Sequence, residues 1–277
     1  MWHFCYTTPM PSVDPKLFSL IIPVYKQEKT IKQDIEDVLA VLSSTQRNFE
    51  IIPVIDGELD KSLLEVKKIK DPRVRPVGYP TNHGKGYAVR YGFSVARGDT
   101  IGFKDGGPDL KALALPVMLA QFEFQKADIV LGSKRHPGSR GSYPAARRIL
   151  SWGYQKFTKL LFGLDVTDTQ VGMKIYKRKV LEDVLPRLLV KKFAFDIEIL
   201  AVSYHLGYRK IYEAPVEINL FTGKSSISIR SIMPVIMNML KDTLAVFYRL
   251  KILRYYDDAS KRKWRFDPEL NFRINIG

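Results

Sequence analysis

The feature that constrains the fold most is a regular alternation of short apolar runs with segments of helical periodicity. Residues 17–24 form a continuous apolar run rich in β-branched side chains, which is typical of a strand buried in a parallel sheet. Residues 30–42 then place apolar side chains three and four positions apart, as on one face of a helix. The alternation of expected strands and helices continues at 49–55, 62–69, 74–77, 86–96, 100–103, 115–124 and 129–131. Such a series predicts an α/β fold with a mostly parallel, doubly wound sheet and flanking helices.

The second half of the chain is less regular. Helices are expected at 147–162, 179–188 and 195–205, and strands at 171–176 and 211–218. We therefore expect three parts along the chain. They are a flexible N-terminal tail over 1–15, one α/β domain over 16–228, and a C-terminal segment of different character over 229–277.

The strong positive charge of the chain calls for an anionic partner. Lys and Arg number 44 against 29 Asp and Glu, a formal net charge of +15, which points to nucleic acid, an anionic membrane face or phosphorylated ligands. No recognised nucleic-acid-binding motif accompanies the charge, so nucleic acid is not expected. The single cysteine, Cys5, excludes a disulfide framework and multi-cysteine metal centres. The first residues lack the basic and apolar regions of a signal peptide, which predicts a cytosolic location.

Candidate functional residues follow directly after the expected strands. Ligands of doubly wound sheets bind beyond the carboxyl ends of the strands, so the segments 25–28, 56–60, 79–86 and 104–109 are expected to line one cleft. In the last of these, Asp105 and Asp109 offer two carboxylates to a hard divalent cation, which prefers oxygen ligands. A plain turn is the alternative, because Asp, Gly and Pro all favour turns.

Further segments are suited to anions or to proton transfer. Lys85, between two glycines at a helix start, suggests an anion site at backbone N–H groups, with a simple helix-leading turn as the alternative. The segment 134–148 is dense in Lys and Arg, which suits phosphate binding, or else forms a solvated surface. Asp168 heads a polar turn, and Asp196 and Glu198 lie in an apolar helix start, where acids also serve the helix dipole.

The C-terminal segment has the pattern of an amphipathic surface helix. Of the 22 residues in 232–253, 15 are hydrophobic, but Lys241, Asp242, Arg249 and Lys251 interrupt them, so a membrane-spanning helix is not expected. A helix lying in the membrane interface is the functional interpretation, extended by the basic residues of 261–265. Packing of this helix on the domain or on a partner subunit is the alternative.

Taken together, the motifs resemble the family-2 glycosyltransferases, in particular the dolichyl-phosphate (polyprenyl-phosphate) mannose and glucose synthases. The resemblance covers about residues 17–226, and NHGKG through KDGG together with DTQVGMK are its most specific parts. It implies a glycosyltransferase A-type, Rossmann-like fold. It also implies inverting transfer of a hexose from a nucleoside-diphosphate sugar to a polyprenyl phosphate, with the enzyme peripheral on the inner, cytoplasmic face of an anionic membrane.

The resemblance also implies roles for individual residues. It assigns contacts with the nucleotide sugar to Pro23, Tyr25, Glu28, Asp56, Lys85 and Asp105. It assigns the ligands of a Mg²⁺ or Mn²⁺ ion to Asp105 and Asp109. Acceptor contacts fall on Arg135, Arg147, Arg148, Ser151, Gln170 and Lys174. Catalytic roles fall on Lys85, Asp105 and Arg148.

Three acids of the family pattern are replaced in this chain. Where the family has Asn-Glu after the tyrosine, this chain has Lys26-Gln27. Ile55 stands in place of the first acid of Asp-Asp-Gly, and Gly107 stands in place of the second acid of Asp-X-Asp. Asp109 could supply the missing metal carboxylate. The alternatives are a related enzyme with a hydroxyl acceptor, for which Glu198 or Asp168 is the candidate base, and a non-catalytic basic protein on the same scaffold.

Overall fold

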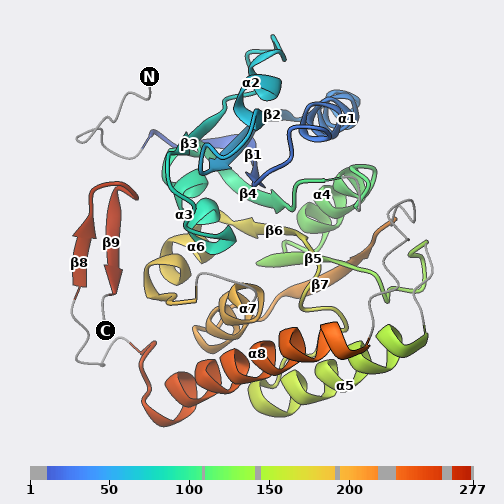
Figure 1. Ribbon diagram of the computed structural model, residues 1–277, viewed down its shortest axis with the longest axis vertical. Helices are drawn as coiled ribbons and strands as arrows, with labels where there is room; N and C mark the ends of the chain where they lie inside the picture. The colour runs from blue at the N-terminus through green and yellow to red at the C-terminus, as the bar shows by residue number, and fades with distance from the viewer. Residues whose placement is uncertain are drawn as a thin grey trace.

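The computed structural model describes residues 11–107, 110–140, 145–190, 194–217, 229–257 and 264–275, with the side chains of 145–149 and 229–236 excepted. Its centre is a seven-stranded sheet with helices on both sides, α1 and α4 on one side and α3 and α6 on the other (Figure 1). The strands, in spatial order, are β3 (Val77–Tyr79), β2 (Asn48–Asp56), β1 (Asp14–Val24), β4 (Gly98–Lys104), β6 (Met173–Lys177), β5 (Ile129–Ser133) and β7 (Ile211–Pro215). This confirms the predicted α/β fold.

One strand of the sheet runs against the others. β6 is antiparallel to both β4 and β5, whereas the β1–β2, β1–β4, β2–β3 and β5–β7 pairs are parallel. The side chains of Leu20, Ile21 and Ile22 in β1 have no exposed surface, because helices cover both faces of the sheet. The continuous apolar run at this strand reflects that double burial.

The helices agree closely with the sequence periodicity. They are α1 (Ile31–Ser43), α2 (Ser62–Lys67), α3 (Lys85–Val95), α4 (Ala114–Phe124), α5 (Ala145–Phe162), α6 (Arg178–Val184), α7 (Phe195–His205) and α8 (Ile229–Phe247), with a 3₁₀ turn η1 (Leu185–Arg187) and a π-helical end η3 (Tyr248–Ile252). The buried face of α1 comprises Ile31, Asp34, Ile35, Val38 and Leu42. Four of these are the expected apolar residues, and the fifth is a carboxylate.

Several expected boundaries differ from the structure, and two of the differences have a clear physical reason. The strand expected at 74–77 begins only at Val77, and Val74 makes an isolated bridge to Ile51, because Val74 N is turned back to Asp71 O and Pro76 has no N–H to donate. The expected tail 1–15 overlaps β1, which begins at Asp14, where the backbone N donates to Arg97 O at 2.8 Å.

Part of the C-terminal segment forms a hairpin that the sequence analysis did not expect. Strands β8 (Trp264–Asp267) and β9 (Phe272–Asn275) form a hairpin whose Phe272 ring packs on Phe93 of α3, with centroids 6.2 Å apart. Leu270 and Phe272 are buried there, since alternate apolar side chains of the hairpin find a partner surface on the domain. The described residues 264–275 therefore pack on the α/β domain.

No helix in the described part of the chain is long and apolar enough to cross a bilayer, in agreement with the expectation for 232–253. Instead, α8 lies beside α5 along one side of the molecule (Figure 1). The hydroxyl groups of Tyr154 on α5 and Thr243 on α8 are 2.9 Å apart. The helix is therefore packed on the domain along one face, as the alternative interpretation expected.

Candidate active site

A row of alternating charges lies at the carboxyl edge of β4. The buried Nζ of Lys174 is 2.6 Å from Asp196 Oδ1, and Asp196 Oδ2 is 2.9 Å from the Nζ of Lys85. The same Lys85 Nζ is 2.7 Å from Asp105 Oδ1. Side-chain exposure rises along the row, from 0% for Lys174 and 7% for Asp196 to 23% for Lys85 and 44% for Asp105. The accessible end is therefore the Asp105 carboxylate beside the Lys85 ammonium.

Burial and the neighbouring charges shift the pKa values of Lys85, Asp196 and Lys174. Burial alone would lower the pKa of Lys85, but the carboxylates of Asp196 and Asp105 outweigh it and hold that pKa above its usual value. Burial would likewise raise the pKa of Asp196, but Lys174 and Lys85 bring it below its usual value. Burial lowers the pKa of Lys174, and Asp196 offsets this only in part. Lys85 is thus a fixed cation, suited to a phosphate oxygen.

The loop before α3 positions Lys85, and Asp56 positions that loop. The Asp56 carboxylate, 3% exposed, accepts hydrogen bonds from His83 N at 2.7 Å, Gly84 N at 2.9 Å and Asn82 Nδ2 at 2.8 Å. Gly84 has φ +91°, a conformation that favours glycine just before Lys85 begins the helix. Asp56 therefore anchors the loop, and its expected contact with base or ribose stays a prediction.

Two residues beneath the Asp105 turn were not predicted from the sequence. The Nζ of Lys104, which has no exposed surface, donates to Asp34 Oδ1 at 2.6 Å, Asp105 O at 3.1 Å and Gly107 O at 3.2 Å. Asp34 Oδ2 accepts from Gly107 N at 3.0 Å, and burial raises the pKa of Asp34 although Lys104 counteracts it. The sequence does contain a sign that both residues are buried, because Asp34 lies on the apolar face of the 30–42 helix and Lys104 ends an apolar strand.

Asp105 is also held from the side by Gly172. The Asp105 N donates to Gly172 O at 2.6 Å, and a Cβ added at Gly172 would lie 2.2 Å from Asp105 Oδ2. Only glycine allows this approach. The DTQVGMK turn therefore contacts the carboxylate directly, which connects two motifs that the sequence analysis treated separately.

The loop after β1 is tied to the loop after β2. Glu28 N donates to Asp60 Oδ2 at 3.1 Å, and Glu28 Oε2 accepts from Lys61 N at 3.1 Å. Tyr25 is 47% exposed and Pro23 is half-buried. Of the expected donor contacts, the structure thus joins Lys85 to Asp105, while Glu28 binds the neighbouring loop.

The expected acceptor residues lie in different settings. Arg135 Nη1 donates to Gln155 Oε1 at 2.6 Å and Thr167 O at 3.1 Å, close to the turn that carries the half-buried Gln170. Ser151 is exposed on α5. Lys174 is a correction, because its fully buried ammonium is bound to Asp196 and is not available to an acceptor. Asp109 and the side chains of Arg147 and Arg148 lie outside the described residues.

The two candidate bases for a hydroxyl acceptor are both engaged. Glu198 has no exposed surface and accepts from Leu189 N, Val190 N and Tyr256 OH, so it cannot reach a substrate. Asp168 accepts from Lys134 N at 3.3 Å and Gln170 N at 3.2 Å. Glu198 as a base is therefore wrong, and Asp168 serves the turn.

The protein ligands at this site fit a divalent ion only if the substrate supplies the remaining ligand atoms. Among the described residues no group of three or more His, Cys, Asp or Glu side chains is placed to hold a metal. The half-exposed Asp105 supplies one carboxylate. Mg²⁺ is commonly bound by one or two carboxylates, water and substrate phosphates, so an ion shared with a diphosphate fits and an all-protein cage does not.

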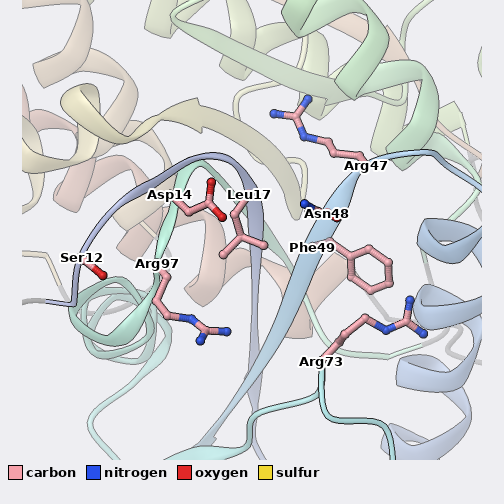
Figure 2. A pocket seen from close by; sticks show the side chains of 8 residues that line it. All are labelled: Ser12, Asp14, Leu17, Arg47, Asn48, Phe49, Arg73 and Arg97. Carbon is pink, nitrogen blue, oxygen red and sulfur yellow. The ribbon is translucent and has the colours of Figure 1, made fainter.

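A cavity of about 490 Å³ lies at the opposite, amino end of the strands. Figure 2 shows Arg47, Arg73 and Arg97 around it. Each guanidinium has an acidic partner, since Arg47 pairs with Glu123, Arg73 with Asp71 and Arg97 with Glu50. The cavity therefore presents no uncompensated positive charge, and we assign it no ligand.

Comparison with known proteins places the chain. Dolichyl-phosphate beta-glucosyltransferase of Drosophila melanogaster is 30% identical over 223 residues, which is 74% of this chain and 68% of the relative. The Homo sapiens protein of the same name is 27% identical over 220 residues, 74% and 67% of the two chains. Dodecaprenyl-phosphate galacturonate synthase of Rhizobium johnstonii is 26% identical over 169 residues, 60% and 49% of the two chains.

A solved structure shows the same fold. Glucosyl-3-phosphoglycerate synthase from Mycobacterium tuberculosis, in complex with Mn²⁺, UDP and glucosyl-3-phosphoglycerate, superposes with a TM-score of 0.64 at 16% identity, over 94% of this chain and 87% of that one. The family described as Glycosyl transferase family 2 matches residues 19–185, the span that carries Asp56, Lys85, Asp105 and Gly172. The chain is therefore a glycosyltransferase and belongs to family 2.

Proposed function

We propose that this chain transfers a hexose, with inversion, from a nucleoside-diphosphate sugar to a polyprenyl phosphate at the cytoplasmic face of a membrane. The observation that carries the proposal is the half-exposed Asp105 carboxylate 2.7 Å from a Lys85 ammonium at the carboxyl edge of the sheet. Relatives named for dolichyl-phosphate and dodecaprenyl-phosphate products support the lipid phosphate.

The donor half of the reaction needs stabilisation of a leaving diphosphate. A Mg²⁺ or Mn²⁺ ion held by Asp105 would act there as a Lewis acid on the diphosphate oxygens. Lys85 adds a fixed ammonium, which Asp196 keeps in place at 2.9 Å. Because this cation is oriented before charge develops, it stabilises the transition state without reorganisation.

The acceptor half favours a phosphate over a hydroxyl. A phosphomonoester is largely dianionic near neutral pH, because its second pKa is about 6, and needs no base. A hydroxyl acceptor does need one. Glu198 is fully buried, and Asp168 already accepts hydrogen bonds from Lys134 N and Gln170 N. Arg135, partly buried beside the Gln170 turn, is a candidate to hold the phosphate dianion.

The pair α5 and α8 supplies a surface suited to a membrane. On α5, Trp152 is 55% and Leu160 83% exposed, and on α8 Met237 and Leu244 are 47% and 48% exposed. Exposed basic side chains accompany them at Lys156, Lys159, Lys241 and Lys251. Apolar burial combined with attraction to anionic headgroups is the energetic basis of interfacial binding. The N-terminal part of α5 carries Ser151, Arg147 and Arg148, so this surface would hold a lipid-linked phosphate near the site.

A panel of donors and acceptors tests the proposal. The purified chain is incubated with UDP- and GDP-hexoses and Mn²⁺, with either a polyprenyl phosphate or a glycolipid hydroxyl acceptor, and the lipid product is identified by mass spectrometry. We expect an acid-labile polyprenyl-phosphate hexose. Transfer to the hydroxyl acceptor alone would favour the related enzyme class, and neither transfer nor donor hydrolysis would favour a non-catalytic protein.

A further inference from the structure

A lysine without exposed surface ends the strand that leads into the donor site. A buried ammonium is tolerated only when its charge and its three N–H groups find partners. Lys104 meets that condition with Asp34 Oδ1 at 2.6 Å, Asp105 O at 3.1 Å and Gly107 O at 3.2 Å. Two of the three acceptors belong to the turn that carries Asp105, rather than to the surrounding core.

The partner carboxylate binds the same turn. Asp34 Oδ2 accepts from Gly107 N at 3.0 Å. Both polar backbone groups of Gly107 and the carbonyl of Asp105 are therefore hydrogen-bonded to one ion pair, which reaches the turn from α1 and β4. Gly172 O accepts from another amide of the turn, Asp105 N, at 2.6 Å.

Gly107 stands where the family pattern has its second acid. Its φ of +112° is a conformation that side chains other than glycine rarely adopt. An acid at this position would be strained. The turn is therefore not held by two side-chain carboxylates, at 105 and 107, that bind one common ion. A different device must hold Asp105 in place.

We propose that the buried Lys104–Asp34 pair is the positioning device of the donor site, holding the 105–107 turn so that Asp105 meets the diphosphate of a nucleotide sugar. Lys104 and Asp34 act through the turn and are positioning residues, not catalytic ones. The inference rests on the proposed function in one respect, the identity of the ligand. The pair orders the turn in the protein without ligand, whatever the ligand is.

A second buried ion cluster provides a matched control. Glu50, 1% exposed in β2, binds Arg75, and Arg97 at 3.0 Å, at the amino end of the sheet, remote from the donor site. If Lys104 and Asp34 only filled the core, variants of either cluster would lower stability in the same way and leave the donor site alone. If the pair positions the turn, only its own variants change that turn and donor affinity.

The test uses the full chain with Lys104→Met, Asp34→Asn and Glu50→Gln. Hydrogen exchange by mass spectrometry, without ligand, is expected to be about tenfold faster for Lys104→Met in peptides covering 104–107, and unchanged there for Glu50→Gln. Calorimetry with UDP-glucose and Mn²⁺ is expected to show about tenfold weaker binding for Lys104→Met, as for other outer partners of a metal site. The KM for the acceptor should stay the same.

Several outcomes decide the inference. Wild-type exchange and wild-type donor affinity in Lys104→Met would overturn it, and so would equal effects of Glu50→Gln on the turn. If Lys104→Met does not fold, Asp34→Asn, which keeps one acceptor oxygen, should still speed exchange at 104–107 and weaken donor binding to a smaller degree; no change in it would equally overturn the inference. If the wild-type chain binds no nucleotide sugar, the proposed function fails, while the exchange comparison still decides whether the pair holds the turn.

Discussion

The two ends of the same sheet both gather buried charges, with different results. At the amino end, Glu50 binds Arg75, Arg97 and the Ser19 hydroxyl, and the cluster is closed around one carboxylate that is 1% exposed. At the carboxyl end, the row from Lys174 through Asp196 and Lys85 opens to the surface at Asp105, which is 44% exposed. Charge count does not separate the two. The group that reaches the surface does, because the exposed side chains of the amino-end cluster are Arg75 and Arg97, at 34% and 45%, whereas the carboxyl-end row exposes a carboxylate, the ligand that a divalent ion prefers.

The largest expected effect comes from removing the open end of the row. Asp105→Asn should lower kcat/KM for the donor about a thousandfold, since it removes the carboxylate proposed to hold the ion on the diphosphate. The fold should survive, because the side chain is half-exposed. Steady-state kinetics with varied Mn²⁺ and a thermal melt measure both quantities. Unchanged Mn²⁺ dependence would contradict the assignment.

Removing the buried acid in the middle of the row should affect both activity and stability. Asp196→Asn leaves Lys174 and Lys85 without their shared carboxylate, and breaking such a buried pair costs about 3 to 5 kcal/mol of unfolding free energy. The donor KM should rise, because Lys85 is no longer fixed. Denaturant unfolding and donor titration check the two effects, with Glu50→Gln expected to lose stability while donor affinity stays unchanged.

The same residue gives a pH dependence. Burial raises the pKa of Asp196, but Lys174 and Lys85 outweigh it, so the folded pKa lies below the unfolded one. The resulting stabilisation is present above the usual carboxyl pKa and is lost as pH falls through the depressed one. Unfolding free energy measured from neutral pH downward should fall less steeply for Asp196→Asn than for wild type. Parallel curves would show that another acid dominates this pH range.

A smaller effect is expected from moving Asp105 instead of removing it. Gly172→Ala would place a Cβ 2.2 Å from Asp105 Oδ2 and displace the carboxylate, weakening donor binding by about tenfold. Gly153→Ala is the control, because nothing lies within 4 Å of its added Cβ in α5. That helical change should leave binding alone and stabilise by about 0.5 to 1 kcal/mol. Equal donor affinities in the two variants would show that the close approach has no role.

The smallest effect concerns the surface of α5 and α8. Trp152→Ala with Leu160→Ala should reduce sedimentation with anionic liposomes a few-fold while leaving donor binding unchanged, because both side chains are exposed and neither belongs to the charged row. High salt should further release the variant, as it screens the lysines. A matched change at the exposed Phe124 of α4 should have no effect on sedimentation. Equal losses from both changes would argue against a specific docking face.

The sequence predicted the fold well because apolar periodicity reports directly on burial. It predicted the proximity of Lys85 and Asp105 through their place after strands. It could not predict the pairings of Asp34 with Lys104 or of Asp196 with Lys174, since these depend on which elements meet in space. Lys174 was misplaced for a similar reason. An apolar run has the same composition in either direction, so the antiparallel course of β6 between β4 and β5 was not visible.

The contacts of Glu198 have a consequence for how the chain and a membrane influence each other. Glu198 accepts a hydrogen bond from Tyr256 OH at 2.7 Å, so the residues just after α8 and η3 are tied to the core of the α/β domain. A C-terminal segment bound this way cannot be removed without leaving a buried carboxylate short of a partner. If the surface of α5 and α8 binds a bilayer as proposed, lipid binding and folding are linked equilibria, because a bilayer that binds only the folded form raises the apparent unfolding free energy. Vesicles should raise the melting temperature of the whole domain, donor site included.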